Sequence, residues 1–201
     1  YYADRLPPVL ETGRGSPAGG TVYDHFMFPI KYQNALFLAD WSEGRILTVR
    51  IKNQGGTYRA DSEVFLQGQP LNVTDICVGP DGSLYFCTGG RGTSGGIYRV
   101  IWDGNIPDRV KNLGTGVAAA IRQPQLESAW ARQKIAGIKA ELGSSWGELV
   151  AGVAYSDENP PHYRTRAMDL MQLFGPVATQ DLLIDLSEAG SEPVRAKAAQ
   201  L

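Results

Sequence analysis

The sequence of 201 residues contains few of the side chains that most often carry metal or redox chemistry. It has two cysteines, Cys77 and Cys87, and two histidines, His25 and His162. Two cysteines set no disulfide framework, and histidines so far apart make a zinc site of histidine and cysteine ligands improbable. The motifs C-x-x-C and C-x-x-C-H are absent, which excludes covalent attachment of haem within this chain.

Long apolar runs and an excess of basic charge are also missing. No window of roughly 18 apolar residues exists, so the sequence predicts no transmembrane helix. The net charge is −2 and neither half is basic, which argues against nucleic acid as the main partner. The N-terminus lacks both the pattern of a signal peptide and an initiating Met, so we expect a mature form or an excised piece.

Glycine and alanine are divided unevenly along the chain. Residues 1–116 hold 18 of the 24 glycines, whereas residues 117–201 hold 15 of the 20 alanines. Glycine marks turns between strands and alanine favours packed helices. The composition therefore predicts two architectures joined near residue 116.

The glycine-rich half contains two similar pairs of predicted strands. Residues 34–41 and 45–49 form the first pair, and residues 82–88 and 96–100 form the second, at offsets of 48 and 51 residues. A further strand is expected over 73–78. A repeat of this length with several strands is typical of a β-propeller blade.

The expected propeller is incomplete, because a closed one needs roughly four to eight blades. We interpret residues 1–102 as the C-terminal part of a β-propeller whose earlier blades are missing. Residues 103–123 are expected to form a linker.

The alanine-rich half contains three similar segments, at 131–135, 163–167 and 194–198. Second helices are expected between them, over 148–153 and 181–186. Paired helices that repeat every thirty-odd residues form an α-solenoid, here close to the HEAT type. We therefore expect HEAT-like α-helical repeats over 124–201, truncated at the end. The fold class predicted for the whole chain is a partial, antiparallel β-propeller followed by an α-solenoid.

The order of motifs in the first half resembles a known family. The segments that carry the resemblance are His25–Pro29, Tyr32–Phe37, Asp40–Ser42, Gly44–Ile46, Phe65–Leu66, Pro70–Leu71, Thr74–Asp75, Gly79–Gly82, Gly89–Thr93 and Tyr98–Val100. They resemble the glucose/sorbosone dehydrogenase-like propellers of large exported proteins of the planctomycete type, in which HEAT-type repeats often follow.

This resemblance implies a fragment of an exported, periplasmic dehydrogenase. The complete protein would oxidise a sugar or a related alcohol or aldehyde with a quinone cofactor, pyrroloquinoline quinone with calcium, and pass electrons to haem. The chain departs from the full pattern because it lacks the earlier blades and any haem-binding motif.

Three residues of the first half are candidates for catalysis or cofactor binding. Asp75 shares one face of its predicted strand with Val73 and Cys77, where it could act as a general base or bind a cation; alternatively, it caps backbone amides at the strand start. His25 could transfer a proton, although a histidine packed in a loop is the favoured interpretation. Asp81 is a turn residue and is given no catalytic role.

Arg91 lies in a glycine-rich loop that matches G-x-G-x-x-G over residues 90–95. A dinucleotide site requires a helix after such a loop, but residues 97–102 continue as a strand, so a hairpin loop is favoured. Arg91 could still bind an anionic cofactor or substrate, or it could pair with a carboxylate of a neighbouring blade.

Two further sets of residues invite a functional interpretation. Cys77 and Cys87 lie diagonally across a predicted hairpin if Val78 opposes Leu84, which is too far for an easy disulfide, so two buried thiols are expected. Arg132, Arg164 and Arg195 recur at one position of each helical segment. They could line a concave ligand-binding face, but hydrogen bonds to neighbouring carbonyls or carboxylates are favoured.

Two classes of function follow. In the first, the chain is a fragment of the sugar-oxidising dehydrogenase, with no metal site predicted from its own residues. In the second, it is a non-catalytic scaffold that binds protein partners, including one on the face of the helical half. No set of residues in the sequence would make an enzyme unaided.

Overall fold

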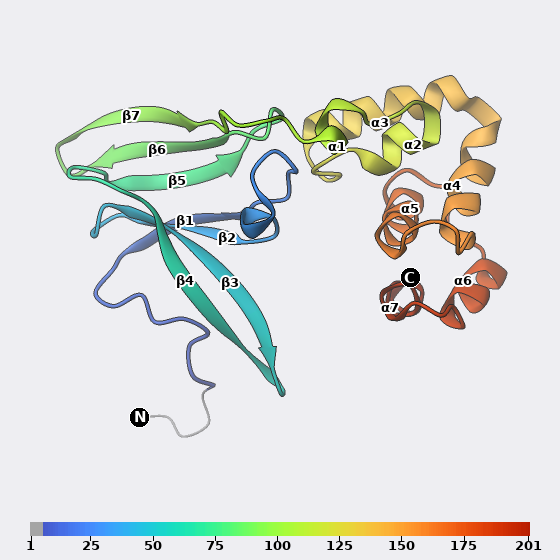
Figure 1. Ribbon diagram of the computed structural model, residues 1–201, viewed down its shortest axis with the longest axis horizontal. Coiled ribbons are helices and arrows are strands. Elements are labelled where there is room, and N and C mark those ends of the chain that lie inside the picture. The colour runs from blue at the N-terminus through green and yellow to red at the C-terminus, as the bar shows by residue number, and fades with distance from the viewer. Residues whose placement is uncertain (1–5) are drawn as a thin grey trace. The chain divides into compact units, whose positions relative to one another are not determined.

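The computed structural model describes residues 6–201 (Figure 1). The chain divides into two compact units, one ending at Val110 and the other beginning at Lys111. Residues 1–5 lie outside the described part of the chain. They belong to the predicted first domain and to the N-terminal segment that lacks the pattern of a signal peptide. Among residues 6–201, no helix combines the length and the apolar character needed to cross a bilayer.

The first sheet of the first unit has four antiparallel strands in sequence order. They are β1 (Pro17–Val22), β2 (Leu36–Asp40), β3 (Arg45–Gln54) and β4 (Thr57–Gln67), with a short 3-10 helix, η1 (Ile30–Tyr32), between β1 and β2. Phe37 and Ala39 alternate with less buried residues along β2, so one face of that strand points into the core.

The second sheet has three antiparallel strands, also in sequence order. They are β5 (Val73–Val78), β6 (Leu84–Gly90) and β7 (Thr93–Val100). Val78 opposes Leu84 and Leu84 opposes Val100, so these three apolar residues lie in one row across the sheet. β5 packs against β1 and β2 of the first sheet.

The core of the first unit is built from both sheets and from the loop between β1 and β2. Its buried members are Tyr23, Phe28, Ala35, Phe37, Ala39, Ile46, Val73, Ile76, Val78, Leu84 and Phe86. The loop contributes the Tyr23 ring, which is completely buried and stacks on Phe28 at 4.7 Å between ring centroids. Because this cluster draws on both sheets, the sheets form one hydrophobic unit.

The Tyr23 hydroxyl connects the β1–β2 loop to the turn between β5 and β6. It donates a hydrogen bond to the Gly82 carbonyl at 2.6 Å and accepts one from the Phe28 N–H at 3.1 Å. A buried hydroxyl without partners would be costly, and both of these contacts are buried. Burial is also the main reason that the pKa of Tyr23 is raised, so the hydroxyl stays protonated.

The second unit is helical. Its elements are α2 (Gly116–Arg122), α3 (Ala129–Leu142), η2 (Gly143–Ser145), α4 (Trp146–Tyr155), α5 (Pro161–Phe174), α6 (Gln180–Ser187) and α7 (Glu192–Gln200), and the short α1 (Asp108–Lys111) lies at the junction of the units. Ser128 caps α3 by accepting a hydrogen bond from the Ala131 N–H, and Pro161 begins α5. Gly175 ends α5 with φ of 68°.

One shared core holds these helices together. Its buried residues are Ala120, Ile121, Leu126, Ala131, Ile135, Trp146, Val150, Ala154, Ala167, Met168, Leu170, Met171, Leu186, Val194 and Ala198. The alanines among them allow neighbouring helix backbones to approach closely. The excess of alanine in this half therefore has a packing role.

The prediction of a partial β-propeller followed by an α-solenoid is wrong. Within residues 6–201, the strands form two small antiparallel sheets of four and three strands, and neither sheet closes. The offsets of 48 and 51 residues come from two hairpins of similar layout, β2–β3 and β6–β7, one in each sheet. A repeated hairpin gives the same period as a repeated blade, so the sequence pattern alone did not distinguish them.

The solenoid prediction fails for a related reason. The predicted helices are present, but α2 packs against α3, α4 and α5 in the shared core. A solenoid instead stacks repeats that contact only their neighbours. The segment that was expected to be a linker, 103–123, contains α2.

We predict that Gly82→Ala destabilises the first unit strongly. Gly82 has φ of +77°, and a Cβ there would lie 2.4 Å from Met27 Cβ and 2.5 Å from His25 Nδ1. The left-handed backbone and the clash together should lower the free energy of unfolding by about 3 kcal/mol. Urea unfolding followed by near-ultraviolet circular dichroism measures the loss.

Gly55→Ala is the matched control. Gly55 also has positive φ, +56°, but no atom lies within 4 Å of a Cβ built there. Only the backbone cost of about 1 kcal/mol is expected. Equal losses in the two variants would contradict the packing role of the Gly82 turn.

Candidate functional site

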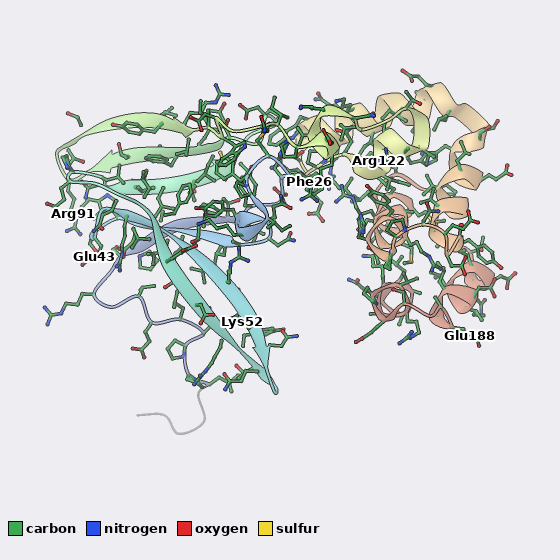
Figure 2. The ribbon with its side chains drawn as sticks, viewed as in Figure 1. Phe26, Glu43, Lys52, Arg91, Arg122 and Glu188 are labelled. Carbon is green, nitrogen blue, oxygen red and sulfur yellow. The ribbon has the colours of Figure 1, made fainter. Side chains whose placement is uncertain are left out.

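The three predicted site residues of the first unit lie at separate places. His25 packs against Gly82, which precedes β6. Arg91, labelled in Figure 2, follows β6 in the turn to β7. β6 has seven residues, so these two ends are on the order of 20 Å apart. Asp75 opposes Cys87, between the two ends of the strand. The structure therefore does not bring the three side chains into one site.

His25 has a structural environment. It is only 2% exposed, and its Nδ1 accepts a hydrogen bond from the Met27 N–H at 3.1 Å. Burial lowers the pKa of His25, and the negative charges of Asp24 and Asp81 oppose this shift only in part. Its contacts match the favoured interpretation of a histidine packed in a loop.

Asp75 lies on the exposed face of β5, but not with all the neighbours predicted for it. The register shifts between Val73 and Asp75, because Val73 opposes Thr88 and Asp75 opposes Cys87. This β-bulge turns Val73 into the core while Asp75 and Cys77 stay exposed. Asp75 Oδ1 accepts a hydrogen bond from the Ile76 N–H at 2.8 Å, so the carboxylate caps the backbone locally.

Arg91 contacts an aromatic ring. Its guanidinium carbon lies 5.4 Å from the centroid of the Trp41 ring, within cation–π range. The Trp41 indole N–H donates to the Gly89 carbonyl at 2.8 Å. The glycine-rich loop is thus fixed against the end of β2, and the strand β7 follows it, so the prediction of a hairpin loop is confirmed.

A polar network that the sequence did not reveal surrounds Asp81. Its Oδ1 accepts the Ser83 N–H at 3.0 Å, and its Oδ2 accepts the Ser83 hydroxyl at 2.8 Å and forms an ion pair with Arg99. Burial alone would raise the pKa of Asp81, but the Ser83 hydrogen bonds and the Arg99 charge outweigh it and lower the pKa. Asp81 precedes β6 and Arg99 lies in β7, so no local sequence motif predicts this ion pair. The network rigidifies the turn.

The two cysteines line a small apolar cavity on the exposed face of the second sheet. Cys77 opposes Tyr85, so the two thiols are diagonal neighbours as predicted, and both are free. The prediction that they are buried is wrong, because Cys77 is exposed and Cys87 half-buried. The cavity has a volume of about 200 Å³ and is lined by Asp75, Ile76, Cys77, Tyr85, Phe86, Cys87 and Ile97.

Two of the three recurring arginines cap helix ends. Arg164 in α5 donates to the Ala154 and Tyr155 carbonyls where α4 ends, at 2.9 and 3.1 Å. Arg195 in α7 donates to the Ala189 and Gly190 carbonyls after α6, at 2.8 and 3.1 Å. This is the favoured alternative, hydrogen bonding to neighbouring carbonyls. The side chain of Arg132 has no such contact within the described residues.

A cavity of the helical unit lies where α4 and α6 end. Its volume is about 560 Å³, and its lining consists of Tyr155, Ser156, Asp157, Glu158, Arg164, Asp185, Leu186, Glu188, Ala189 and Gly190. Figure 2 labels Glu188, which follows the last residue of α6. Four carboxylates against the single lining guanidinium of Arg164 make this cavity acidic. None of the four forms an ion pair within residues 6–201.

The carboxylates of this cavity were not among the predicted site residues. Asp157 and Glu158 lie in the α4–α5 loop, and Asp185 and Glu188 lie near the end of α6. They are about thirty residues apart in sequence, and only the antiparallel packing of successive helices unites them. In the sequence, only the recurrence of helices about every thirty residues indicated that these carboxylates lie near one another.

Neither a family model, nor a curated protein, nor a solved structure matches this chain. Among residues 6–201, no group of three or more His, Cys, Asp and Glu side chains is arranged to hold a metal ion. Within residues 6–201, His25, Asp75 and Arg91 line no common pocket. The cofactors stay a prediction from the resemblance.

We predict that His25 makes the first unit sensitive to mild acid. Its pKa is lowered below 6.5 in the folded state, so the unfolded chain takes up the proton first as the pH falls. The stability is full above about pH 7 and decreases as the pH falls through about 6.5 towards the lowered pKa. His25→Gln should flatten this dependence, measured by urea unfolding at a series of pH values. His162→Gln, a change at an exposed residue of the other unit, should leave it intact; the same slope in all three proteins would contradict the assignment.

We predict unequal effects from removing the two capping arginines. Arg164 is buried, so Arg164→Met leaves two carbonyls at the end of α4 without a partner. The helical unit should lose about 2–3 kcal/mol of unfolding free energy. Arg195 is exposed, so in Arg195→Met water can donate to the carbonyls that Arg195 contacts. This variant should lose less than about 1 kcal/mol of unfolding free energy. Far-ultraviolet circular dichroism during urea unfolding measures both, and a reversed order would refute the burial argument.

Proposed function

We propose that this chain is a non-catalytic binding scaffold whose helical unit binds a basic peptide segment of a protein partner. The acidic cavity of about 560 Å³ at the ends of α4 and α6 is the observation that supports this proposal. A volume of this size accommodates one or two lysine or arginine side chains. The proposed ligand is therefore a segment that carries adjacent positive charges.

The charge around the cavity favours a cation. The partial negative charges of two helix C-termini, those of α4 and α6, add to the four carboxylates. Arg164 and Arg195 already occupy these helix ends, which illustrates the preference of this region for guanidinium groups. Both donate to backbone carbonyls, and none of the four lining carboxylates forms an ion pair within residues 6–201, so these carboxylates can bind an incoming ligand.

The wall of the cavity adds an aromatic contact. Tyr155 lines it and is well exposed, so its ring can lie against the aliphatic part or the charge of a lysine or arginine. Ser156 is the single hydroxyl other than Tyr155 in the lining, and no histidine lies beside it there. The lining therefore supports binding rather than nucleophilic catalysis.

The dehydrogenase function stays a prediction from the resemblance of the first half. No contact of His25, Asp75 or Arg91 supports it over the scaffold, because each of them is engaged in packing or capping. Exported localisation, the sugar substrate and the quinone likewise stay predictions.

We predict that a fluorescein-labelled hexalysine peptide binds the full chain and that the cavity carboxylates cause the binding. The double variant Asp157→Asn/Glu188→Gln should weaken the affinity by about tenfold, since each exposed ion pair contributes roughly 0.2–1 kcal/mol. Fluorescence anisotropy at low salt measures the dissociation constant, and added salt should weaken binding further.

The matched control is Glu127→Gln/Glu141→Gln, which removes the same charge from residues of the helical unit outside the cavity. This variant should change the affinity less than about twofold. An equal loss in both double variants would show attraction by net charge alone. That result, or the absence of binding to the unaltered chain, would overturn the proposed site.

A further inference from the structure

β7 is the outermost strand of its sheet and is unpaired on one side (Figure 1). Its ladder with β6 runs from Thr93, opposite Gly90, to Val100, opposite Leu84. Within residues 6–201, no backbone hydrogen bond is formed on its other side. Such a row of free N–H and C=O groups is a template for a further strand.

The other outer strands of the two sheets have features that hinder pairing with a further strand, and β7 lacks these features. On β4, Ala60 donates its N–H to the Val9 carbonyl at 3.0 Å, and the strand carries three charged residues, Arg59, Asp61 and Glu63. β5 packs against β1. β7 contains no proline and one charged residue, Arg99, which pairs with Asp81. It therefore lacks the usual features that prevent edge pairing.

The sequence of β7 is complementary to itself when two copies run antiparallel. If Ile97 opposes Ile97, then Tyr98 opposes Gly96, Arg99 opposes Gly95, and Val100 opposes Ser94. Apart from Ile97, which faces its own counterpart, each large side chain thus lies beside a residue with little or no side chain. Cross-strand neighbours lie about 4.5–5.5 Å apart, so this alternation of large and small residues avoids collisions.

The charges also permit this pairing. The two Arg99 side chains would be offset by four positions, or about 13 Å along the strands. This separation exceeds the Debye length at physiological salt, roughly 8 Å, so their repulsion is largely screened.

Exposed apolar side chains along this edge favour an interface. Ile97 is 82% exposed, and Tyr98 is half exposed although its ring stacks on Phe86. Ile101 and Trp102, directly after β7, are exposed as well. Pairing of two copies would cover Ile97 with its counterpart and extend the apolar contact at both ends of the new ladder.

We propose that β7 pairs antiparallel with β7 of a second copy of this chain, with Ile97 opposite Ile97. The two three-stranded sheets then form one six-stranded sheet with a two-fold axis beside Ile97. This interface lies in the first unit and does not involve the acidic cavity of the helical unit, so the two proposals can be tested independently.

Sedimentation equilibrium of the full chain tests the interface. We expect a reversible dimer with twice the 21.8 kDa mass of the chain. Ile97→Lys should raise the dissociation constant of the dimer by at least about tenfold, because it places two lysines directly opposite each other. Ile51→Lys, at an exposed residue of β3 in the other sheet, is the matched control and should leave the dimer unchanged.

Disulfide cross-linking tests the register in the background Cys77→Ser/Cys87→Ser. Under mild oxidation by oxidised glutathione, Ile97→Cys should form a covalent dimer much faster than Ser94→Cys, which faces Val100 in the proposed pairing. A monomer at every concentration, equal effects of Ile97→Lys and Ile51→Lys, or equal cross-linking at 97 and 94 would overturn the proposal.

Discussion

Both units depend on one constraint. Backbone carbonyls at the ends of strands and helices find no partner within their own element and need one from elsewhere in the protein. Water cannot reach the buried ones, so each must accept a hydrogen bond from within the protein. In the first unit, the Tyr23 hydroxyl and the Trp41 indole serve carbonyls of the second sheet. In the helical unit, Arg164 and Trp146 donate hydrogen bonds to carbonyls at the ends of α4 and α5. Tyr23, Trp41 and Trp146 connect segments distant in sequence, whereas Arg164 connects two successive helices.

The acidic cavity of the helical unit arises from the same constraint. α4 and α6 end in the same region, and the arginines that cap them come from the helices that follow. The polar loops left at these ends carry the carboxylates. The feature that makes the cavity suitable for a cation is therefore a by-product of how the helices are capped.

Much of the secondary structure followed from the sequence, but the architecture did not. The strands β2, β3, β5, β6 and β7 and the helices α3 to α7 lie where apolar alternation or helical spacing placed them. β1 and β4 were missed because Pro17–Val22 is rich in glycine and Thr57–Gln67 is largely polar. Both gain their pairing from neighbours across the sheet. The bulge at Asp75 and the ion pair of Asp81 with Arg99 depend on tertiary registers that no local pattern encodes.

Two of the four tryptophans, Trp41 and Trp146, can give each unit its own optical signal. Trp41 lies against the Arg91 guanidinium in the first unit, whereas Trp146 is buried in the core of the second and donates to the Gly175 carbonyl. Indole emission depends on the charge and the solvent around the ring, so the two residues report different environments. Variants that retain only Trp41 or only Trp146, with Trp102 and Trp130 also replaced, would show whether the units unfold together or one after the other. The hydrogen bonds that hold these two rings in place therefore also allow the cooperativity of unfolding between the units to be measured by intrinsic fluorescence.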